Sequence, residues 1–173
     1  GRTITGVRKV YSSRGRETFE AVKGMDMEIR PGELISLLGP SGCGKTTTLH
    51  MIAGFEAPTT GKILLAGRDI RELSLPALRT AVATAFEDPT LFSMSVAENL
   101  ALGRGADNPA TDDEIRAAID IAAAQFVYDL PFGLDTRIGE QGMSLSGGQR
   151  QRLSLARAIL AGPRILVLDD TLS

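Results

Sequence analysis

GPSGCGKT (39–46) matches the pattern G-x-x-x-x-G-K-[ST] at every position. An apolar run, ELISLLG (33–39), precedes it and predicts a buried strand. The residues that follow predict a helix from about Lys45 to Ala53, with Gly54 as its C-terminal cap. A strand, a glycine-rich turn and a helix in this order are the context that a phosphate-binding loop requires. The stretch therefore predicts such a loop.

Glycines allow this kind of backbone to curl so that successive N–H groups point at phosphate oxygens. The start of the following helix adds the positive end of its dipole. Lys45 is placed to reach the β- and γ-phosphates, and the hydroxyl of Thr46 to bind Mg²⁺. We therefore expect ATP and Mg²⁺ as ligands. The expected nucleotide-binding residues of this stretch are Gly39, Ser41, Gly42, Cys43, Gly44, Lys45, Thr46 and Thr47.

The chain ends on RILVLDDTLS (164–173), where four apolar residues run into two aspartates. The apolar run predicts a second buried strand over 164–169. Carboxylates at the tip of a buried strand are costly unless something binds them. In P-loop proteins a second strand ends in an aspartate that holds Mg²⁺, and Asp169 fits that role.

Other periodic segments complete an α/β pattern. Strands are predicted near 3–11, 21–29, 61–67 and 84–88, and a helix is predicted near 75–82. Two capping boxes, at Ser95 with Glu98 and at Thr111 with Glu114, predict helix starts. A further helix is predicted over 147–160. A mixed β-sheet that carries a mostly helical insert is an α/β fold.

Composition limits the classes of protein to consider. The length of 173 residues suits a single domain, and the net charge is −2. Because no basic block is present, nucleic acid is not expected as a partner. The single cysteine, Cys43, excludes a disulfide within the chain. No apolar run approaches the ~20 residues of a membrane helix.

LSGGQ (145–149) opens the helix predicted over 147–160. Ser146, Gly147 and Gly148 are small residues at a helix start, where free N–H groups can bind an anion. An amphipathic helix with a flexible cap is the simpler interpretation. One observation speaks against this simpler interpretation of LSGGQ: a single domain has no evident use for two loops that both suit phosphate.

With both loops in this order, before a terminal apolar strand and an aspartate, the sequence resembles the ATP-binding cassette (ABC) family, the nucleotide-binding domains of ABC transporters. The resemblance implies an ABC ATPase core with a helical signature subdomain. It implies that two cassettes pair head to tail, so that Ser146, Gly147, Gly148 and Gln149 bind the nucleotide of the other cassette. Residues 1–88 and 162–173 then form the nucleotide-binding core, and about 89–161 the helical subdomain.

The same resemblance implies the partners and the place of the protein. The partners are a second cassette, in a homo- or heterodimer, and a transmembrane transporter subunit or domain. The expected location is the cytoplasmic face of the cell membrane. The N-terminal part of the chain resembles import-type cassettes, and the part beyond about Ile70 to Ala77 resembles export-type cassettes. Transport direction and substrate are therefore left open.

Three further positions take roles from the family pattern. Tyr11 resembles the aromatic residue that stacks on adenine; the alternative is a tyrosine buried at the end of a strand. Glu87 stands where the family has a glutamine that contacts Mg²⁺ and the attacking water. Residues 139–142 resemble the stretch that contacts intracellular loops in exporters, although they are equally compatible with a simple turn.

Two departures from the family pattern concern hydrolysis. Asp170 occupies the position of the glutamate that acts as general base, and its shorter side chain matters because a misplacement of about 1 Å can cost about 10²-fold in rate. The family also has a histidine after this position, whereas the only histidine here is His50. We therefore expect the C-terminal part of the fold to be missing and hydrolysis to be weak or absent.

Four functions remain open on this evidence. The first is an ATPase that drives a transporter. The second is the degenerate half of an asymmetric pair, which binds ATP without turning it over, and Asp170 and Glu87 favour it. The others are a soluble ABC ATPase acting on DNA or ribosomes, and a non-functional fragment.

Overall fold

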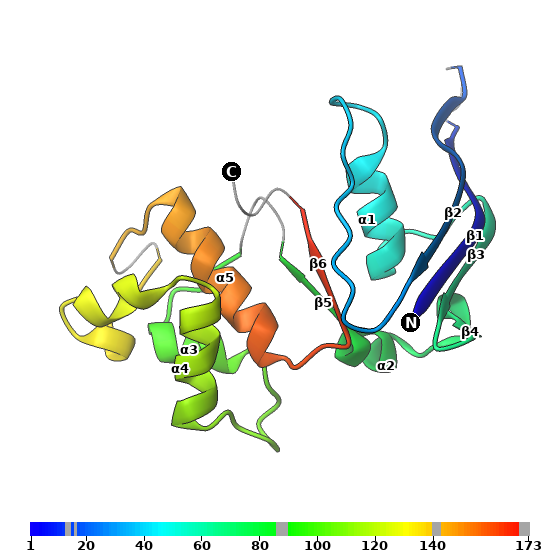
Figure 1. Ribbon diagram of the computed structural model, residues 1–173. Helices are drawn as coiled ribbons and strands as arrows, with labels where there is room; N and C mark the ends of the chain where they lie inside the picture. Colours follow the sequence, from blue (N-terminus) through cyan, green and yellow to red (C-terminus); the bar gives the residue numbers. More distant parts are fainter. Residues whose placement is uncertain (13–14, 16, 86–89, 140–142, 170–173) are drawn as a thin grey trace. The chain divides into compact units, whose positions relative to one another are not determined.

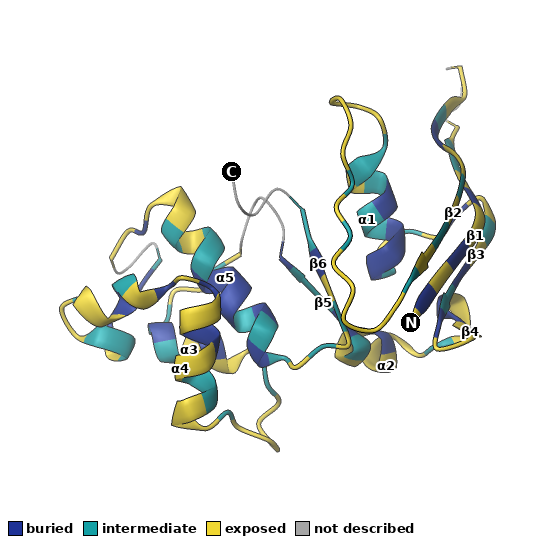
Figure 2. Cartoon of the chain, in the orientation of Figure 1, coloured by how far each residue is buried: buried dark blue, intermediate teal, exposed yellow. Residues whose placement is uncertain are grey.

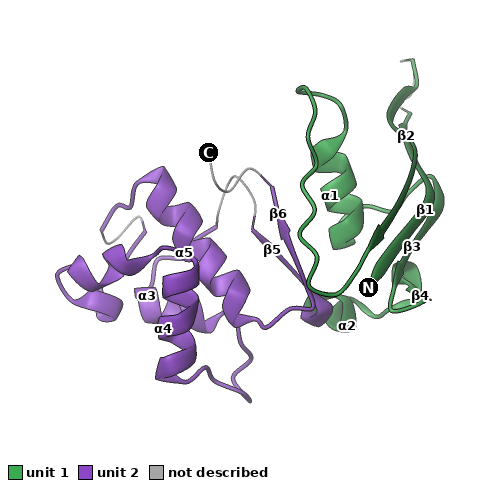
Figure 3. Cartoon of the chain, viewed as in Figure 1, with its two compact units in different colours: residues 1–79 green, residues 80–173 purple. Residues whose placement is uncertain are grey.

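The computed structural model (Figure 1) describes residues 1–12, 15, 17–85, 90–139 and 143–169. The chain divides into two compact units, residues 1–79 and residues 80–173 (Figure 3). Each unit contains both helices and strands, which confirms the α/β class. None of the helices in the described ranges combines the length and apolarity that crossing a bilayer requires.

The first unit is built on a four-stranded antiparallel sheet, ordered β2-β1-β3-β4. Its strands are β1 (Arg2–Tyr11), β2 (Phe19–Ile29), β3 (Thr60–Leu65) and β4 (Arg68–Asp69). Its helical segments are α1 (Lys45–Ala53), the 3₁₀ turn η1 (Ile70–Glu72) and α2 (Leu75–Ala81), which reaches the boundary of the unit. The prediction of α1 is confirmed to the residue.

One face of this sheet carries the core of the first unit. In β1, Arg2 and Ile4 are buried while Thr3 and Thr5 are exposed, because successive side chains of a strand point to opposite faces. Val7, three residues after Ile4, is also buried, because the pairing with β2 shifts register between these two residues. Met51 and Ile52 of α1 are buried as well (Figure 2). The helix α1 contacts β2, and this contact helps to fix the helix that follows the phosphate loop.

Gly54 ends α1 for two physical reasons. Its backbone has φ +82°, in the left-handed region that glycine adopts at little cost. In addition, a Cβ atom at this position would lie 2.3 Å from Cδ2 of Leu78 in α2. The predicted C-terminal cap is therefore confirmed, and it also allows close packing between α1 and α2.

The strand predicted over 33–39 is wrong as a description of this structure. These residues are described, but they form no strand, and Leu34 and Leu38 are 92% and 91% exposed. An apolar run becomes a strand only where neighbouring strands accept its backbone hydrogen bonds. Among the described residues no strand pairs with 33–39, so the run stays extended and open to solvent.

The second unit contains the parallel pair β5 (Val82–Ala85) and β6 (Ile165–Leu168). Their register places Val82 beside Ile165 and Ala85 beside Leu168. The strand predicted near 84–88 thus begins earlier, and residues 86–89 lie outside the described part. The prediction that β6 is buried holds for Val167 alone, because within the described ranges only β5 lies beside it.

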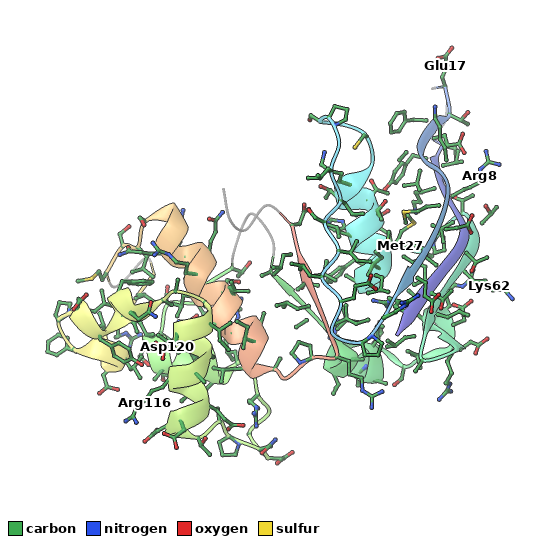
Figure 4. All side chains as sticks on the ribbon, in the orientation of Figure 1. Arg8, Glu17, Met27, Lys62, Arg116 and Asp120 are labelled. Carbon is green, nitrogen blue, oxygen red and sulfur yellow. The ribbon has the colours of Figure 1, made fainter. Side chains whose placement is uncertain are left out.

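Helices supply the rest of the second unit. They are α3 (Val96–Ala101), α4 (Asp112–Ile121), α5 (Gly147–Leu160) and the 3₁₀ turns η2 (Gln125–Asp129) and η3 (Gly133–Asp135). Both predicted capping boxes form at the starts of α3 and α4. Arg116 and Asp120 lie on the exposed side of α4 (Figure 4). Its buried side joins a hydrophobic core that includes Val96, Leu100, Ile119, Val127, Ile138, Leu145, Leu153, Leu155 and Leu160.

Candidate functional site

The predicted phosphate loop leads directly into α1 and presents its backbone to solvent. Ser41, Gly42 and Cys43 are exposed. The amide of Cys43 donates to the carbonyl oxygen of Pro40 at 3.3 Å, which tightens the turn. Gly42 and Gly44 have φ +81° and φ +89°, values at which any other residue is strained. The loop thus has the curled form that its glycine spacing predicts.

Side chains at two of these glycines would collide with the loop or with the sheet. A Cβ atom at Gly39 would lie 2.6 Å from Sγ of Cys43, and one at Gly44 would lie 2.2 Å from the carbonyl oxygen of Ala21. By contrast, a Cβ atom at Gly42 would meet nothing within 4 Å. At Gly44 the loop therefore has no room for a side chain, which suits a cradle of backbone N–H donors for phosphate.

Lys45 places its positive charge against this loop. Its Nζ donates to the carbonyl oxygens of Gly39, at 2.7 Å, and Pro40, at 2.9 Å, and lies 3.6 Å from Sγ of Cys43. Both carbonyl acceptors are neutral. A cation held here is suited to pair with the oxygens of a polyphosphate.

The start of α1 supplies further donors. Its N-cap residue is Gly44, which has no side chain to cap the first turn, and among the described residues no side chain takes over that role. The first amides of a helix have no partner within the helix. In α1 these amides belong to Lys45, Thr46 and Thr47. The site therefore combines curled backbone, unpaired donors and a lysine, which together fit a phosphate chain.

Tyr11 ends β1 and is 39% exposed, which excludes the buried strand-end position considered above. Its hydroxyl donates to Oε2 of Glu56 at 2.5 Å. This bond joins the end of β1 to the segment that follows α1.

Electrostatics at this contact follow from the hydrogen bond. Glu56 accepts the proton of the phenol, and this raises the pKa of Tyr11, with burial adding to the effect. The same bond lowers the pKa of Glu56, and the nearby charge of Lys9 lowers it further. Nζ of Lys9 lies 3.5 Å from Oε2 of Glu56 and 5.0 Å from the centroid of the Tyr11 ring.

The LSGGQ segment forms the start of α5. Oγ of Ser146 accepts from the amide of Gln149 at 3.2 Å, and Oε1 of Gln149 accepts from the amide of Ser146 at 2.9 Å. Gly147 and Gly148 are exposed, and Arg152 donates to the carbonyl oxygen of Gly148 at 3.2 Å. This helix start carries a complete capping box, and its two glycines are exposed.

The predicted magnesium ligands are only partly placed. Thr46 belongs to the first unit and Asp169 to the second, where its amide donates to the carbonyl oxygen of Ala85 at 3.0 Å. Glu87 and Asp170 lie outside the described residues, as do residues 140–142. The metal site and the general base therefore remain predictions from the sequence.

The sequence patterns did not identify two residues of this site, Lys9 and Glu56. Lys9 and Glu56 contact Tyr11, and the only signal for either was that Lys9 lies two residues before Tyr11 on the same strand. Glu56 is distant in sequence, so no local pattern identifies it. His50, the single histidine of the chain, lies edge-on to Phe55 with ring centroids 6.0 Å apart.

Comparisons with known proteins agree with this geometry. A family model described as "ABC transporter" matches residues 22–173. The chain is 46% identical to the "ATP-dependent lipid A-core flippase" of Thiobacillus denitrificans, over 98% of this chain and 31% of that protein. It is 41% identical to "Multidrug resistance protein 1" of Entamoeba histolytica, over 96% of this chain and 13% of that protein.

A plant protein is similar to the same extent. "ABC transporter B family member 21" of Arabidopsis thaliana is 39% identical over 98% of this chain and 13% of its own length. The chain thus spans between about an eighth and a third of the curated relatives it matches. Since the family model covers most of the chain and contains both the phosphate loop and the LSGGQ helix start, this protein belongs to the ABC transporter family, as a nucleotide-binding domain.

Proposed function

We propose that this chain binds Mg-ATP at the loop formed by residues 39–47. The observation that carries the proposal is the position of Lys45, whose ammonium group lies against the carbonyl oxygens of Gly39 and Pro40. A charge at the mouth of a backbone cradle is the arrangement that a triphosphate requires. ATP binding is also what membership of the family implies.

Each residue of the loop has a distinct role in this proposal. The amides from Ser41 to Thr47 donate to the phosphate oxygens, and Lys45 reaches the β- and γ-phosphates. The hydroxyl of Thr46, with Asp169 and Glu87, holds Mg²⁺. When bound, this ion neutralises negative charge between the last two phosphates.

The direct test is a calorimetric titration of Lys45→Ala with Mg-ATP. We expect the variant to bind at least about tenfold more weakly, because hydrogen bonds to charged groups contribute ~1.5–3 kcal/mol each. Lys62→Ala is the matched control, since Lys62 is an exposed lysine of β3 (Figure 4). Equal affinities of Lys45→Ala and the wild type would contradict the proposal.

We further propose that the protein acts as one of two paired cassettes on a membrane transporter. The start of α5, with Ser146, Gly147, Gly148 and Gln149, then completes the nucleotide site of the second cassette, in a homo- or heterodimer. The transmembrane partner places the chain at the cytoplasmic face of the membrane. The names of the relatives, multidrug transporters and a lipid flippase, support an export or flippase role.

The domain division proposed for this role follows the family pattern. Residues 1–88 and 162–173 form the nucleotide-binding core, and about 89–161 form the helical subdomain with the signature. The proposal is supported by the position of α3, α4 and α5, which all lie within the second range.

A second candidate is a degenerate cassette that binds ATP but hydrolyses it slowly or not at all. Asp170 in the position of the general-base glutamate favours it, with Glu87 in place of glutamine. Asp170→Glu lengthens the side chain by one methylene and should raise phosphate release about tenfold or more, because placement of the base limits the rate. Phosphate release near the enzyme median of ~10 s⁻¹ by the wild type would exclude this candidate.

A further inference from the structure

Two groups converge on the Tyr11 ring, and neither is part of the phosphate loop's pattern. Glu56 accepts from the phenol, and Lys9 lies over the ring. Tyr11 is the last residue of β1. An aromatic side chain at such a position needs anchoring if it is to keep one orientation.

The segment that carries Glu56 is itself fixed to β1. Nζ of Lys9 donates to the carbonyl oxygen of Ala57 at 2.9 Å. The amide of Val10 donates to Oγ1 of Thr59 at 2.9 Å, and the amide of Thr59 donates to the carbonyl oxygen of Arg8 at 2.8 Å. Glu56 is therefore held beside the strand end, and its bond to Tyr11 restrains the ring.

Lys9 also makes the two faces of the ring unequal. Its side chain is only 16% exposed, and its Nζ lies 5.0 Å from the ring centroid, within the range of a cation–π contact. A planar base cannot stack on the face that this ammonium group covers. Tyr11 is 39% exposed, so part of its side chain is open to a ligand, and we expect stacking on the face opposite Lys9.

We propose that Glu56 and Lys9 are positioning residues that hold Tyr11 as a one-faced platform for the base of the bound nucleotide. This inference rests on the proposed binding of ATP. Glu56 holds the hydroxyl end of the Tyr11 side chain in place, and Lys9 occupies one face of the ring. Because Glu56 follows directly after α1, its bond to Tyr11 ties the ring to the helix that begins at the phosphate loop.

The test compares two ligands, Mg-ATP and inorganic tripolyphosphate, which has the phosphate chain but no base. For Glu56→Gln we expect about three- to tenfold weaker binding of Mg-ATP, since stacking of a base on an aromatic ring contributes substantially to affinity. Binding of tripolyphosphate should not change. Lys9→Met should weaken Mg-ATP binding in the same selective way.

Glu20→Gln is the matched control. Glu20 of β2 forms an ion pair with Arg8 of β1, and its replacement removes one negative charge, as Glu56→Gln does. It should leave both affinities unchanged. A double-mutant cycle adds specificity: Tyr11→Phe keeps the ring but loses the hydroxyl. If the bond to Glu56 acts through that hydroxyl, Tyr11→Phe with Glu56→Gln should bind Mg-ATP no more weakly than either single variant.

A spectroscopic readout separates positioning from a general effect on folding. The chain has two tyrosines and no tryptophan, so in a Tyr128→Phe background the phenolate absorbance reports Tyr11 alone. The bond to Glu56 raises the pKa of Tyr11, so Glu56→Gln should lower that pKa. An unchanged titration would show that the tether is absent and would overturn the inference.

The remaining outcomes are equally decisive. Unchanged Mg-ATP affinity of Glu56→Gln, or an equal loss for Mg-ATP and tripolyphosphate, would overturn the inference while leaving the proposed function intact. A wild type that binds neither ligand would overturn the proposed function itself, and the inference with it. Lys45→Ala should lose both ligands, which identifies the phosphate loop independently of Tyr11.

Discussion

A Cβ atom added to Gly44 would lie 2.2 Å from the carbonyl oxygen of Ala21, so the phosphate loop and β2 touch through bare backbone. Gly44 also has φ +89°. Gly44→Ala therefore combines a steric clash with backbone strain, and we expect it to lower the free energy of unfolding by about 2–4 kcal/mol. Chemical denaturation measures this loss.

Gly42→Ala is the control for that prediction. Gly42 has φ +81°, but a Cβ atom there meets nothing within 4 Å. The variant should lose only the cost of the left-handed conformation, about 1–2 kcal/mol. Equal losses for the two variants would show that the contact between Gly44 and Ala21 is not tight.

Arg2 is a charged residue in the interior of the first unit, and its replacement should stabilise the protein. It is fully buried, and its three guanidinium nitrogens have no hydrogen-bond partner within the described residues. Burial lowers its pKa to about 10. Because an unpaired buried charge is costly, Arg2→Met should raise the free energy of unfolding by about 1–4 kcal/mol.

Arg68→Met serves as the comparison, because Arg68 is exposed on β4. Thermal and denaturant melts of both variants should show a gain for Arg2→Met and little change for Arg68→Met. A loss of stability for Arg2→Met would mean that the guanidinium has an acceptor in solution.

Ser146 and Ser95 cap α5 and α3 with the same reciprocal bonds, but only Ser146 belongs to LSGGQ. Each Ser→Ala change should cost about 1 kcal/mol of stability, because one helix donor loses its acceptor. Only Ser146→Ala should weaken the Mg-ATP-dependent pairing of cassettes, measured by sedimentation. A similar effect of Ser95→Ala on pairing would assign the loss to stability alone.

The stability of the first unit should fall in acid because of Asp69. Its carboxylate accepts from Nη2 of Arg71 at 2.7 Å and from Nε and the amide of Arg71 at 3.0 Å each. These bonds lower the pKa of Asp69 from 3.8 to about 2. A lowered carboxyl pKa stabilises the fold above the unfolded value, and this contribution is lost as the pH falls from about 4 to about 2.

Asp69→Asn removes that dependence. We expect it to cost on the order of 1 kcal/mol near neutral pH and to differ less from the wild type at pH 2, because the ion pair is then gone in both proteins. Glu72→Gln, an exposed change in the same segment, is the control. A difference from the wild type that does not shrink in acid would contradict the assignment.

Local signals in the sequence predict the helices of this fold well. The ends of α1 and the capping boxes of α3 and α4 depend on residues within a few positions of one another, and all are found. The strand over 33–39 fails because a strand depends on partners distant in sequence. Leu34 and Leu38 show this: they are apolar and yet exposed.

The candidate site likewise contains residues that a local motif predicts and contacts that no local motif predicts. The glycines and Lys45 follow a short motif, and the structure gives them the expected curled loop. The contact between Tyr11 and Glu56 joins a strand end to a turn after α1, and no local pattern contains it. The burial of Arg2 follows the alternation of β1, because Arg2 lies on the same inward face of the strand as Ile4.

The central claim is that the phosphates of Mg-ATP bind the backbone of residues 39–47. The most direct measurement is the amide NMR spectrum of the labelled chain during a titration with Mg-ATP. We predict saturable shifts of the amide signals of Gly42, Gly44, Lys45 and Thr46, and their loss in Lys45→Ala. Amide signals of this loop that stay unmoved at saturating Mg-ATP would contradict the account.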